Sequence, residues 1–414
     1  MENKFENFFR FEYKILFVYI FYKIYYITVF PGVDFLHSIV FYLDLLILVP
    51  FIVYNFNFDN FFEFKINFYN LPIFFLYLTL FFFLFSSFIV NNSFISFNAF
   101  LKIIVYIVLF YSFFYKFSKI LFKSDELFEK FLNIIIIFAC ISSFFSFCSV
   151  FFGFNSEGRF YGTTIGFFIN PNSTAFVYSF AIPVIIYKFM TKRINNILFF
   201  IILLIFLYCL VFTLSRAGFI AVLISILFIT FSKSKKLFIV ISLILLVILS
   251  SYINELLSLK TDSSLARGLL FLTAISIITS TTQTFLFGYG VTNAITVFEE
   301  EKKSFGNFEV TVNNPHNFIL LIMIQYGLLT LLPYLFFIFS LIIAGIKNRI
   351  KIPEIKDKRK LELCIAIVLG LLAQNLFEEI IVVPEFPVMS VTLIFMGIIY
   401  CFIIKGKRKQ VEFE

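Results

Sequence analysis

Four polar side chains stand out because each interrupts an apolar sequence with a group able to do chemistry. Three are arginines: Arg159 in EGRFYG, Arg216 in TLSRAGF and Arg267 in SSLARGLLF. The fourth is His316 in NNPHNFILL, directly after Pro315 and before an apolar run. A guanidinium group presents a planar fork of donors that binds phosphate oxygens in pairs. Several such groups at the depth of lipid headgroups predict a site for a lipid-linked diphosphate.

His316 is the candidate proton acceptor. The sequence places it near the N-terminus of a helix, where the positive end of the helix dipole favours the neutral imidazole. A neutral imidazole takes up a proton, as a general base must. The competing interpretation of His316 is a residue at a helix start whose side chain contacts only water. For each arginine the competing interpretation is an anchor that holds the chain at the membrane surface. The other histidine, His37, has no polar cluster around it and is interpreted as structural.

Further charged residues lie within or beside apolar runs. Glu378 and Glu379 are expected to orient an arginine or His316, although two consecutive residues cannot both face one site. Lys23 and Asp44 stand at similar depths in two neighbouring apolar runs. We interpret them as a structural ion pair, because ionisable groups in lipid need a partner.

The composition requires lipid as the solvent. The 414 residues are 61% hydrophobic and 14% charged, with a mean hydropathy of +0.99, outside the range of soluble domains. The net charge of +8 is spread over many short loops, which excludes a continuous face for nucleic acid. All five cysteines lie in apolar runs, so neither a disulfide nor a metal site is expected. The acidic run 299–301 is predicted to be solvated, and no cofactor is expected.

The elements that must position these residues are membrane-spanning helices, each of about 20 apolar residues. The sequence predicts an all-α membrane protein with one polytopic domain over residues 1–414. The tenth predicted span is long enough to kink at Pro333. The twelve predicted spans are 11–30, 34–54, 70–90, 98–117, 129–152, 173–190, 194–214, 216–232, 236–252, 317–346, 362–382 and 386–405.

The distribution of lysine and arginine predicts that both termini are cytoplasmic, since cytoplasmic loops retain positive charge. Most of the 33 basic residues fall in the loops of one side. The segment 253–316 then lies outside, between the ninth and tenth spans, and carries part of the site. Its part 266–280 has Thr273, Ser276 and Ser280 at helical spacing, which predicts a helix lying on the membrane surface. The basic residues predicted outside are Arg159, Arg216, Lys260, Arg267, Lys302 and Lys303.

The series GRFYGTTIGFFINPNSTA, LSRAG, ARG followed by FGYG, and PHNFILL resembles the O-antigen ligase and polymerase superfamily of bacterial envelopes. The resemblance covers roughly residues 155–345. It implies transfer of a glycan from an undecaprenyl-diphosphate carrier to a sugar hydroxyl, on the outer face of the bacterial inner membrane. The acceptor is the lipid A core for a ligase and a second lipid-linked repeat unit for a polymerase. The layout of the loops favours the ligase.

The resemblance also implies roles for individual residues. Arg216, Arg267 and His316 are the expected catalytic residues of a metal-independent transferase that inverts the anomeric carbon. Tryptophans common in the family are absent, so Tyr161 and Tyr289 are expected to replace them as platforms for a sugar. The expected substrate-binding residues are Arg159, Asn172, Asn317, Tyr289 and Glu378.

Two other classes of function remain open. A transporter or flippase of lipid-linked sugars would place its polar residues near the midplane of the membrane, whereas here they gather at one surface. A metal-dependent transferase of lipid-linked sugars would carry acidic pairs in its first outer loop, and that loop offers little beyond Asp34. These functions rank second and third.

Overall fold

Helices form the whole regular structure of the part of the chain described by the computed structural model. That part comprises residues 70–90, 104–152, 171–233, 239, 261–290, 293–305, 314–378 and 387–411. The predicted all-α class is confirmed for these residues. The helices are α3 (Leu71–Val90), the π-helix η2 (Phe110–Phe117), α5 (Ser118–Lys123), α6 (Asp125–Phe152), α7 (Pro171–Met190), α8 (Asn196–Phe212), α9 (Arg216–Lys233), α11 (Thr261–Thr279), α12 (Thr282–Phe287), α13 (Asn293–Ser304), α14 (Phe318–Tyr326), α15 (Leu328–Lys351), α16 (Ile355–Asn375) and α17 (Pro387–Val411).

Six helices within the described residues are long and apolar enough to cross a membrane. They make the chain a multi-pass membrane protein. The predicted spans 11–30, 34–54 and nearly all of 236–252 lie outside the described residues, so the total of twelve stays a prediction. The six are Ile104–Lys123, Asp125–Cys148, Asn172–Met190, Arg216–Lys233, Leu328–Lys351 and Val388–Gly406, and shorter apolar helices cover Leu71–Ser86, Asn196–Phe212 and Arg267–Thr279.

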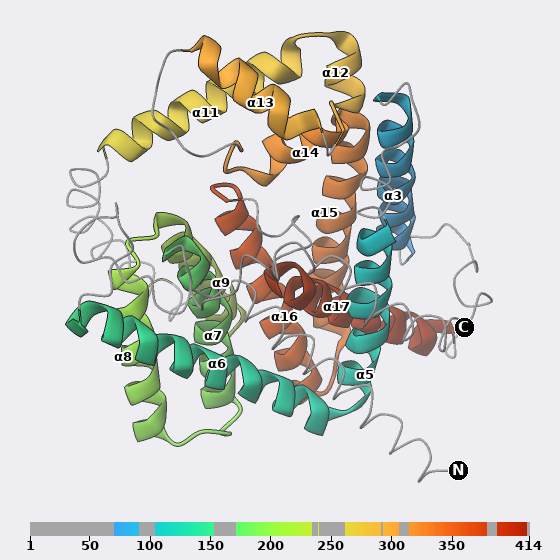
Figure 1. The fold of residues 1–414 in the computed structure, drawn as a ribbon. Coiled ribbons are helices and arrows are strands. Elements are labelled where there is room, and N and C mark those ends of the chain that lie inside the picture. The colour runs from blue at the N-terminus through green and yellow to red at the C-terminus, as the bar shows by residue number, and fades with distance from the viewer. Residues whose placement is uncertain are drawn as a thin grey trace.

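Helix α16 lies within the bundle, packed against α7, α9, α15 and α17 (Figure 1). Its crossing with α9 is close, because Gly370 faces the backbone of Ala221 and Ser225 Oγ donates to the Ala366 carbonyl at 2.9 Å. Small residues permit such approach between helices in lipid, where burial of apolar surface does not drive association. These contacts fix the position of α16 relative to α9.

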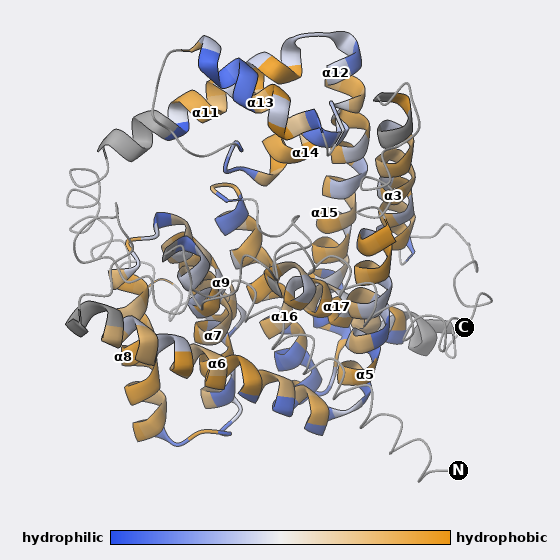
Figure 2. Cartoon of the chain, in the orientation of Figure 1, coloured by the Kyte–Doolittle hydropathy of each residue, from blue (hydrophilic) through white to orange (hydrophobic). Residues whose placement is uncertain are grey.

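Helices α11, α12, α13 and α14 lie together across one end of the molecule, at the top of Figure 1. From this end α15 and α3 run side by side into the bundle. Apolar residues cover most of α15, whereas α13 carries a hydrophilic stretch (Figure 2). The four helices therefore form a cap over one end of the apolar bundle.

The helix predicted over 266–280 is confirmed by α11. Two of the three polar residues of the prediction do not face water: Thr273 is buried, and Ser276 Oγ donates to Glu301 Oε1 at 2.6 Å, whereas Ser280 is exposed. The exposed side of α11 carries Phe271 and Leu272, 47% and 53% exposed. This apolar outer side suits contact with lipid, and a position on the membrane surface stays a prediction.

The predicted span 317–346 is two helices in the structure. Helix α14 ends and α15 begins on either side of Gly327, whose φ is 72°. The break therefore lies at Gly327, and Pro333 stands inside α15. Glycine adopts this left-handed conformation without the steric cost that a Cβ brings.

Close backbone packing explains why glycine is needed at the break. A Cβ on Gly327 would overlap the backbone of Leu286, and a Cβ on Gly288 would come within 2.5 Å of the backbone of Gln325. Gly288 also has a φ of 72°. The two glycines thus let the ends of α12 and α14 meet backbone to backbone.

The N-terminal half of α16 carries buried ion pairs. Glu362, whose side chain is 2% exposed, lies 2.7 Å from both Arg349 and Arg359. Lys360, 1% exposed, donates to the Leu121 carbonyl at 2.9 Å. These basic residues belong to the loops predicted to be cytoplasmic.

Candidate active site

The carboxylate of Glu378 joins three of the predicted site residues. Its side chain is 3% exposed, and Oε1 accepts a hydrogen bond from Asn172 Nδ2 at 2.6 Å. Oε1 also lies 3.3 Å from Arg267 Nη2, and Oε2 lies 3.5 Å from His316 Nδ1. A carboxylate buried this deeply needs such partners. We call these four side chains the Glu378 cluster.

Each member of the Glu378 cluster comes from a different element. Asn172 lies in the first turn of α7, Arg267 in α11, and His316 just before α14. Glu378 follows the end of α16, which is shorter at this end than the predicted span 362–382. The carboxylate is therefore presented by the segment after a helix, beneath the cap formed by α11 to α14.

His316 has an unusual backbone conformation. Its φ of 48° lies in the left-handed region, which costs a residue with a side chain roughly 1–3 kcal/mol. The Asn314 side chain holds the turn, since His316 N donates to Asn314 Oδ1 at 3.1 Å. Strained backbones of this kind concentrate at functional sites, and the conformation of His316 therefore marks it as a candidate functional residue.

Asn317 ties the histidine to the end of α16. Its Oδ1 caps α14 by accepting from Ile319 N at 2.9 Å and Leu320 N at 3.1 Å. Its Nδ2 donates to the Leu376 carbonyl at 2.7 Å. The side chain predicted to bind substrate is thus engaged in holding His316 beside Glu378.

Arg216 begins α9, where Ser215 acts as the cap and accepts from Gly218 N at 3.2 Å. The Arg216 side chain is partly buried, and the cation of Arg267 acts on it electrostatically. Arg216 and Arg267 therefore lie close enough for their charges to interact, and Arg267 lies beside Glu378, so this side of the site carries an excess of positive charge. Such an excess attracts a multiply charged phosphate group.

Several predicted residues lie elsewhere. The Tyr289 hydroxyl is 3.2 Å from Ser280 Oγ, and Tyr289 N donates to the Ile324 carbonyl at 2.7 Å. Tyr289 thus contacts the end of α14 opposite to His316, about 13 Å away at 1.5 Å per residue. The structure does not bring it to the Glu378 cluster. The residues that lie outside the described part of the chain are Lys23, His37, Asp44, Arg159, Tyr161 and Glu379.

Gln374 is a supporting residue that the sequence analysis missed. It is fully buried, and its Oε1 accepts from Ser179 Oγ at 2.8 Å. This contact ties α7, which carries Asn172, to α16, which precedes Glu378. The available signal was the spacing of Gln374 and Glu378, four residues apart on one helical face near the polar end of an apolar run.

The chemistry of the site follows from its groups. The arginines supply fixed positive charge, and the imidazole supplies a proton acceptor whose Nδ1 lies 3.5 Å from a carboxylate oxygen. Among the described residues, no three His, Cys, Asp or Glu side chains gather where they could hold a metal ion. The Glu378 cluster and Arg216 are therefore suited to acid–base work on an anionic substrate.

A comparison with protein families supports the resemblance of the motifs. Residues 200–335 match the model of the family described as O-antigen ligase. The matched segment contains Arg216, Arg267 and His316, whereas Asn172 and Glu378 lie beyond it. Comparison with curated proteins found no match. Residues 200–335 are therefore similar to the O-antigen ligase family that the motifs resemble.

Proposed function

We propose that the chain transfers a glycan from an undecaprenyl-diphosphate carrier to a sugar hydroxyl, with the lipid A core as the acceptor. The observation that carries this proposal is the Glu378 cluster, in which one carboxylate lies 3.3 Å from Arg267 and 3.5 Å from His316. Arg267, a cation able to bind phosphate, and His316, a proton acceptor, then both lie beside the carboxylate of Glu378. The family match supports the same class of reaction.

The arginines act on the leaving group. As the bond between the anomeric carbon and the phosphate oxygen breaks, negative charge grows on the diphosphate. Arg216 and Arg267 stabilise that charge, and groups fixed in advance do so without reorganisation at the moment of reaction. Glu378 holds Arg267 in place, while the N-terminus of α9 places Arg216.

His316 acts on the acceptor. The acceptor oxygen forms the new bond to the anomeric carbon as its proton passes to Nε2 of His316. Glu378, 3.5 Å from Nδ1, orients the ring and stabilises the imidazolium that forms, as the carboxylate does in a Ser-His-Asp triad. Attack from the face opposite the diphosphate inverts the anomeric carbon, and no step needs a metal ion.

The structure changes the expectation drawn from the helix dipole. His316 stands before Asn317, the cap residue of α14, and its Nδ1 lies 3.5 Å from Oε2 of Glu378. The carboxylate, and not the helix start alone, therefore forms the surroundings of the ring.

The two ends of α16 support the proposed orientation. The Glu378 cluster lies at one end, and the ion pairs of Glu362 lie at the other. Cytoplasmic ends of spans retain basic residues, so Arg349 and Arg359 favour the cytoplasm for the second end. The site then faces the periplasm.

The glycan phenotype of a deletion strain tests the proposal. A ligase leaves the lipid A core bare while lipid-linked polymer accumulates. A core that carries one repeat unit would instead show a polymerase. Lipid-linked sugar trapped on the inner face would show a transporter and contradict the proposal.

A further inference from the structure

The three most exposed large apolar side chains of the described residues are isoleucines. Ile350 is 79% exposed, Ile355 76% and Ile197 75%. They lie in the last turn of α15, the first turn of α16 and the first turn of α8. All three therefore belong to two connections, residues 190–197 and residues 350–356. We call these connections the α7–α8 hairpin and the α15–α16 hairpin.

Exposed lysines stand beside these isoleucines. The α7–α8 hairpin contains Lys192 and Arg193 and no acidic residue. The α15–α16 hairpin contains Lys351 and Lys356, with Glu354 as its one acidic residue. Lys192 and Lys351 are exposed, and neither forms an ion pair within the described part of the chain. Each hairpin thus presents an ammonium group without a carboxylate partner next to apolar surface.

Helix α6 holds the two hairpins near one another. Asp125, in its first turn, has Oδ2 2.5 Å from Lys356 Nζ. Glu129, one turn later, has Oε1 2.8 Å from Arg193 Nη1. The two acidic residues are about 6 Å apart along the helix axis, at 1.5 Å per residue. The hairpins therefore lie against neighbouring turns of α6, and a ligand at this end of α6 can reach both.

The hairpins lie at the end of the bundle away from the Glu378 cluster. Helix α7 runs from Asn172, which contacts Glu378, to the α7–α8 hairpin, whose loop is hydrophilic in Figure 2. Helix α15 has 24 residues and is about 36 Å long, whereas the hydrocarbon core is about 30 Å thick. The last turn of α15, with Ile350, is therefore expected at the depth of lipid headgroups.

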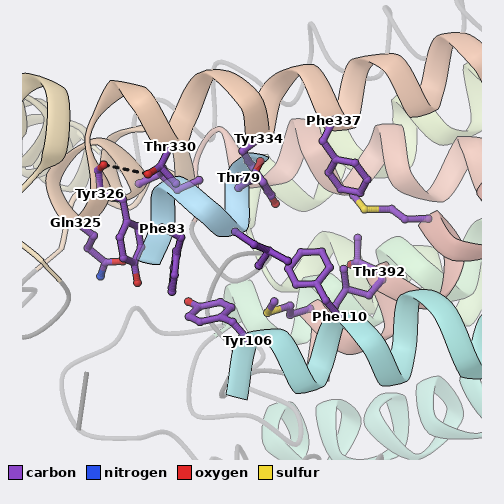
Figure 3. A pocket seen from close by; sticks show the side chains of 15 residues that line it. Thr79, Phe83, Tyr106, Phe110, Gln325, Tyr326, Thr330, Tyr334, Phe337 and Thr392 are labelled. Carbon is purple, nitrogen blue, oxygen red and sulfur yellow. Dashed lines mark hydrogen bonds between the residues drawn. The ribbon is translucent and has the colours of Figure 1, made fainter. Parts of the chain in front are cut away.

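The interior of the bundle offers little room by comparison. The cavity in Figure 3, whose wall includes Phe83, Tyr326 and Phe337, has a volume of about 60 Å³. One water molecule needs about 10–15 Å³ of such volume, so this cavity holds a few water molecules and no lipid. A lipid that binds near the hairpins therefore binds at the surface.

We propose that the two hairpins bind an anionic phospholipid, in the leaflet on the far side of the membrane from the Glu378 cluster. Lys192 and Lys351 contact the phosphate, and Ile350 and Ile355 contact the upper part of the acyl chains. Basic residues at a membrane surface attract anionic lipids in this way. A soluble acidic protein would match the lysines alone, whereas a lipid matches both the charge and the apolar surface at one depth. The site goes beyond the proposed reaction, which uses neither hairpin.

Binding of defined lipids tests the role of charge. The wild-type protein in detergent is titrated with phosphatidylglycerol or with phosphatidylcholine of the same chains, and bound lipid is counted by native mass spectrometry. We expect tighter binding of phosphatidylglycerol. Lys192→Gln/Lys351→Gln should raise its Kd roughly 25-fold, at about fivefold for each lysine, and leave the Kd for phosphatidylcholine unchanged. Equal binding of both lipids by the wild type would overturn the proposal.

Lys302→Gln/Lys303→Gln is the matched control, because it removes the same charge from α13 in the cap. Its Kd for phosphatidylglycerol should equal that of the wild type. An equal rise of the Kd in both double variants would show that net charge alone attracts the lipid, and would reject the hairpins as its site.

Photolabelling locates the lipid independently. Phosphatidylglycerol with a diazirine on its headgroup, added to the wild type in phosphatidylcholine nanodiscs, is expected to label residues 190–197 and 350–356. Ile350→Ser/Ile355→Ser should lower the yield of label, and an unchanged yield would contradict the apolar contact. Labels confined to the cap would overturn the proposal. If a variant fails to insert, the labelling pattern of the wild type still decides where the lipid binds.

Discussion

Replacing Glu378 by glutamine separates the charge of the carboxylate from its shape. The amide oxygen can still accept from Asn172, at the 2.6 Å position. Arg267 and His316, at 3.3 and 3.5 Å, both lose a negative partner. The side chain of Arg267 is 43% exposed, so solvent screens much of its attraction to the carboxylate. The loss of the carboxylate therefore removes mainly the stabilisation of the His316 imidazolium that forms during the reaction.

The magnitude follows from the distance between the imidazole and the carboxylate. A hydrogen bond to a charged group contributes about 1.5–3 kcal/mol, which corresponds to about 13- to 160-fold in kcat. Because Nδ1 lies 3.5 Å from Oε2, we expect a decrease in kcat near the lower end of this range. The KM for the donor should change little, because Arg216 keeps its place at the start of α9.

The assay is glycan transfer by purified protein with saturating donor. Glu362→Gln is the control, because Glu362 is as buried as Glu378 but pairs with arginines at the other end of α16. It is expected to leave the kcat of the folded protein unchanged whatever it does to stability. Wild-type kcat for Glu378→Gln would refute the positioning role.

Three further predictions follow from the site, the fold and the topology. Arg216→Lys keeps the charge but loses the paired donors, so kcat/KM should fall by a factor that corresponds to about 3 kcal/mol of transition-state stabilisation, at normal expression. Unchanged kcat/KM would contradict a role of Arg216 in binding phosphate. Gly327→Ala should lower the thermal midpoint in detergent, because the left-handed backbone alone costs roughly 1–3 kcal/mol, whereas Gly268→Ala, with nothing within 4 Å of the added Cβ, should not. Single cysteines at Asn307 and Lys356 should react oppositely with an impermeant thiol reagent, and labelling of the Lys356 site in intact cells would overturn the proposed orientation.

Local sequence patterns predicted most of the helices that the structure describes. Apolar length and charge predicted the described spans, and the spacing of Thr273 and Ser276 predicted α11. The sequence did not indicate which side of α11 faces the protein. That side is set by the contact between Ser276 and Glu301, which forms only when α13 packs against α11. The break at Gly327 was missed for a similar reason: it depends on Gly288, which lies near it only in space.

The site shows the same division between local and distant information. The types of Arg267 and His316 indicated phosphate binding and proton transfer without a structure. The contact between Asn172 and Glu378 joins residues 206 positions apart, and no local pattern specifies it. Asn317 was assigned to substrate because it follows the histidine, whereas its partners are the start of α14 and the end of α16.

The most direct test of the account is the turnover of His316→Ala in a purified transfer assay with saturating donor and a chelator present. Loss of a positioned general base should lower kcat by roughly a hundredfold to ten-thousandfold, with donor KM near that of the wild type. His37→Ala, which removes the other of the two histidines, should retain full turnover. Near wild-type turnover of His316→Ala would show that the Glu378 cluster anchors the helices and that the chemistry lies elsewhere.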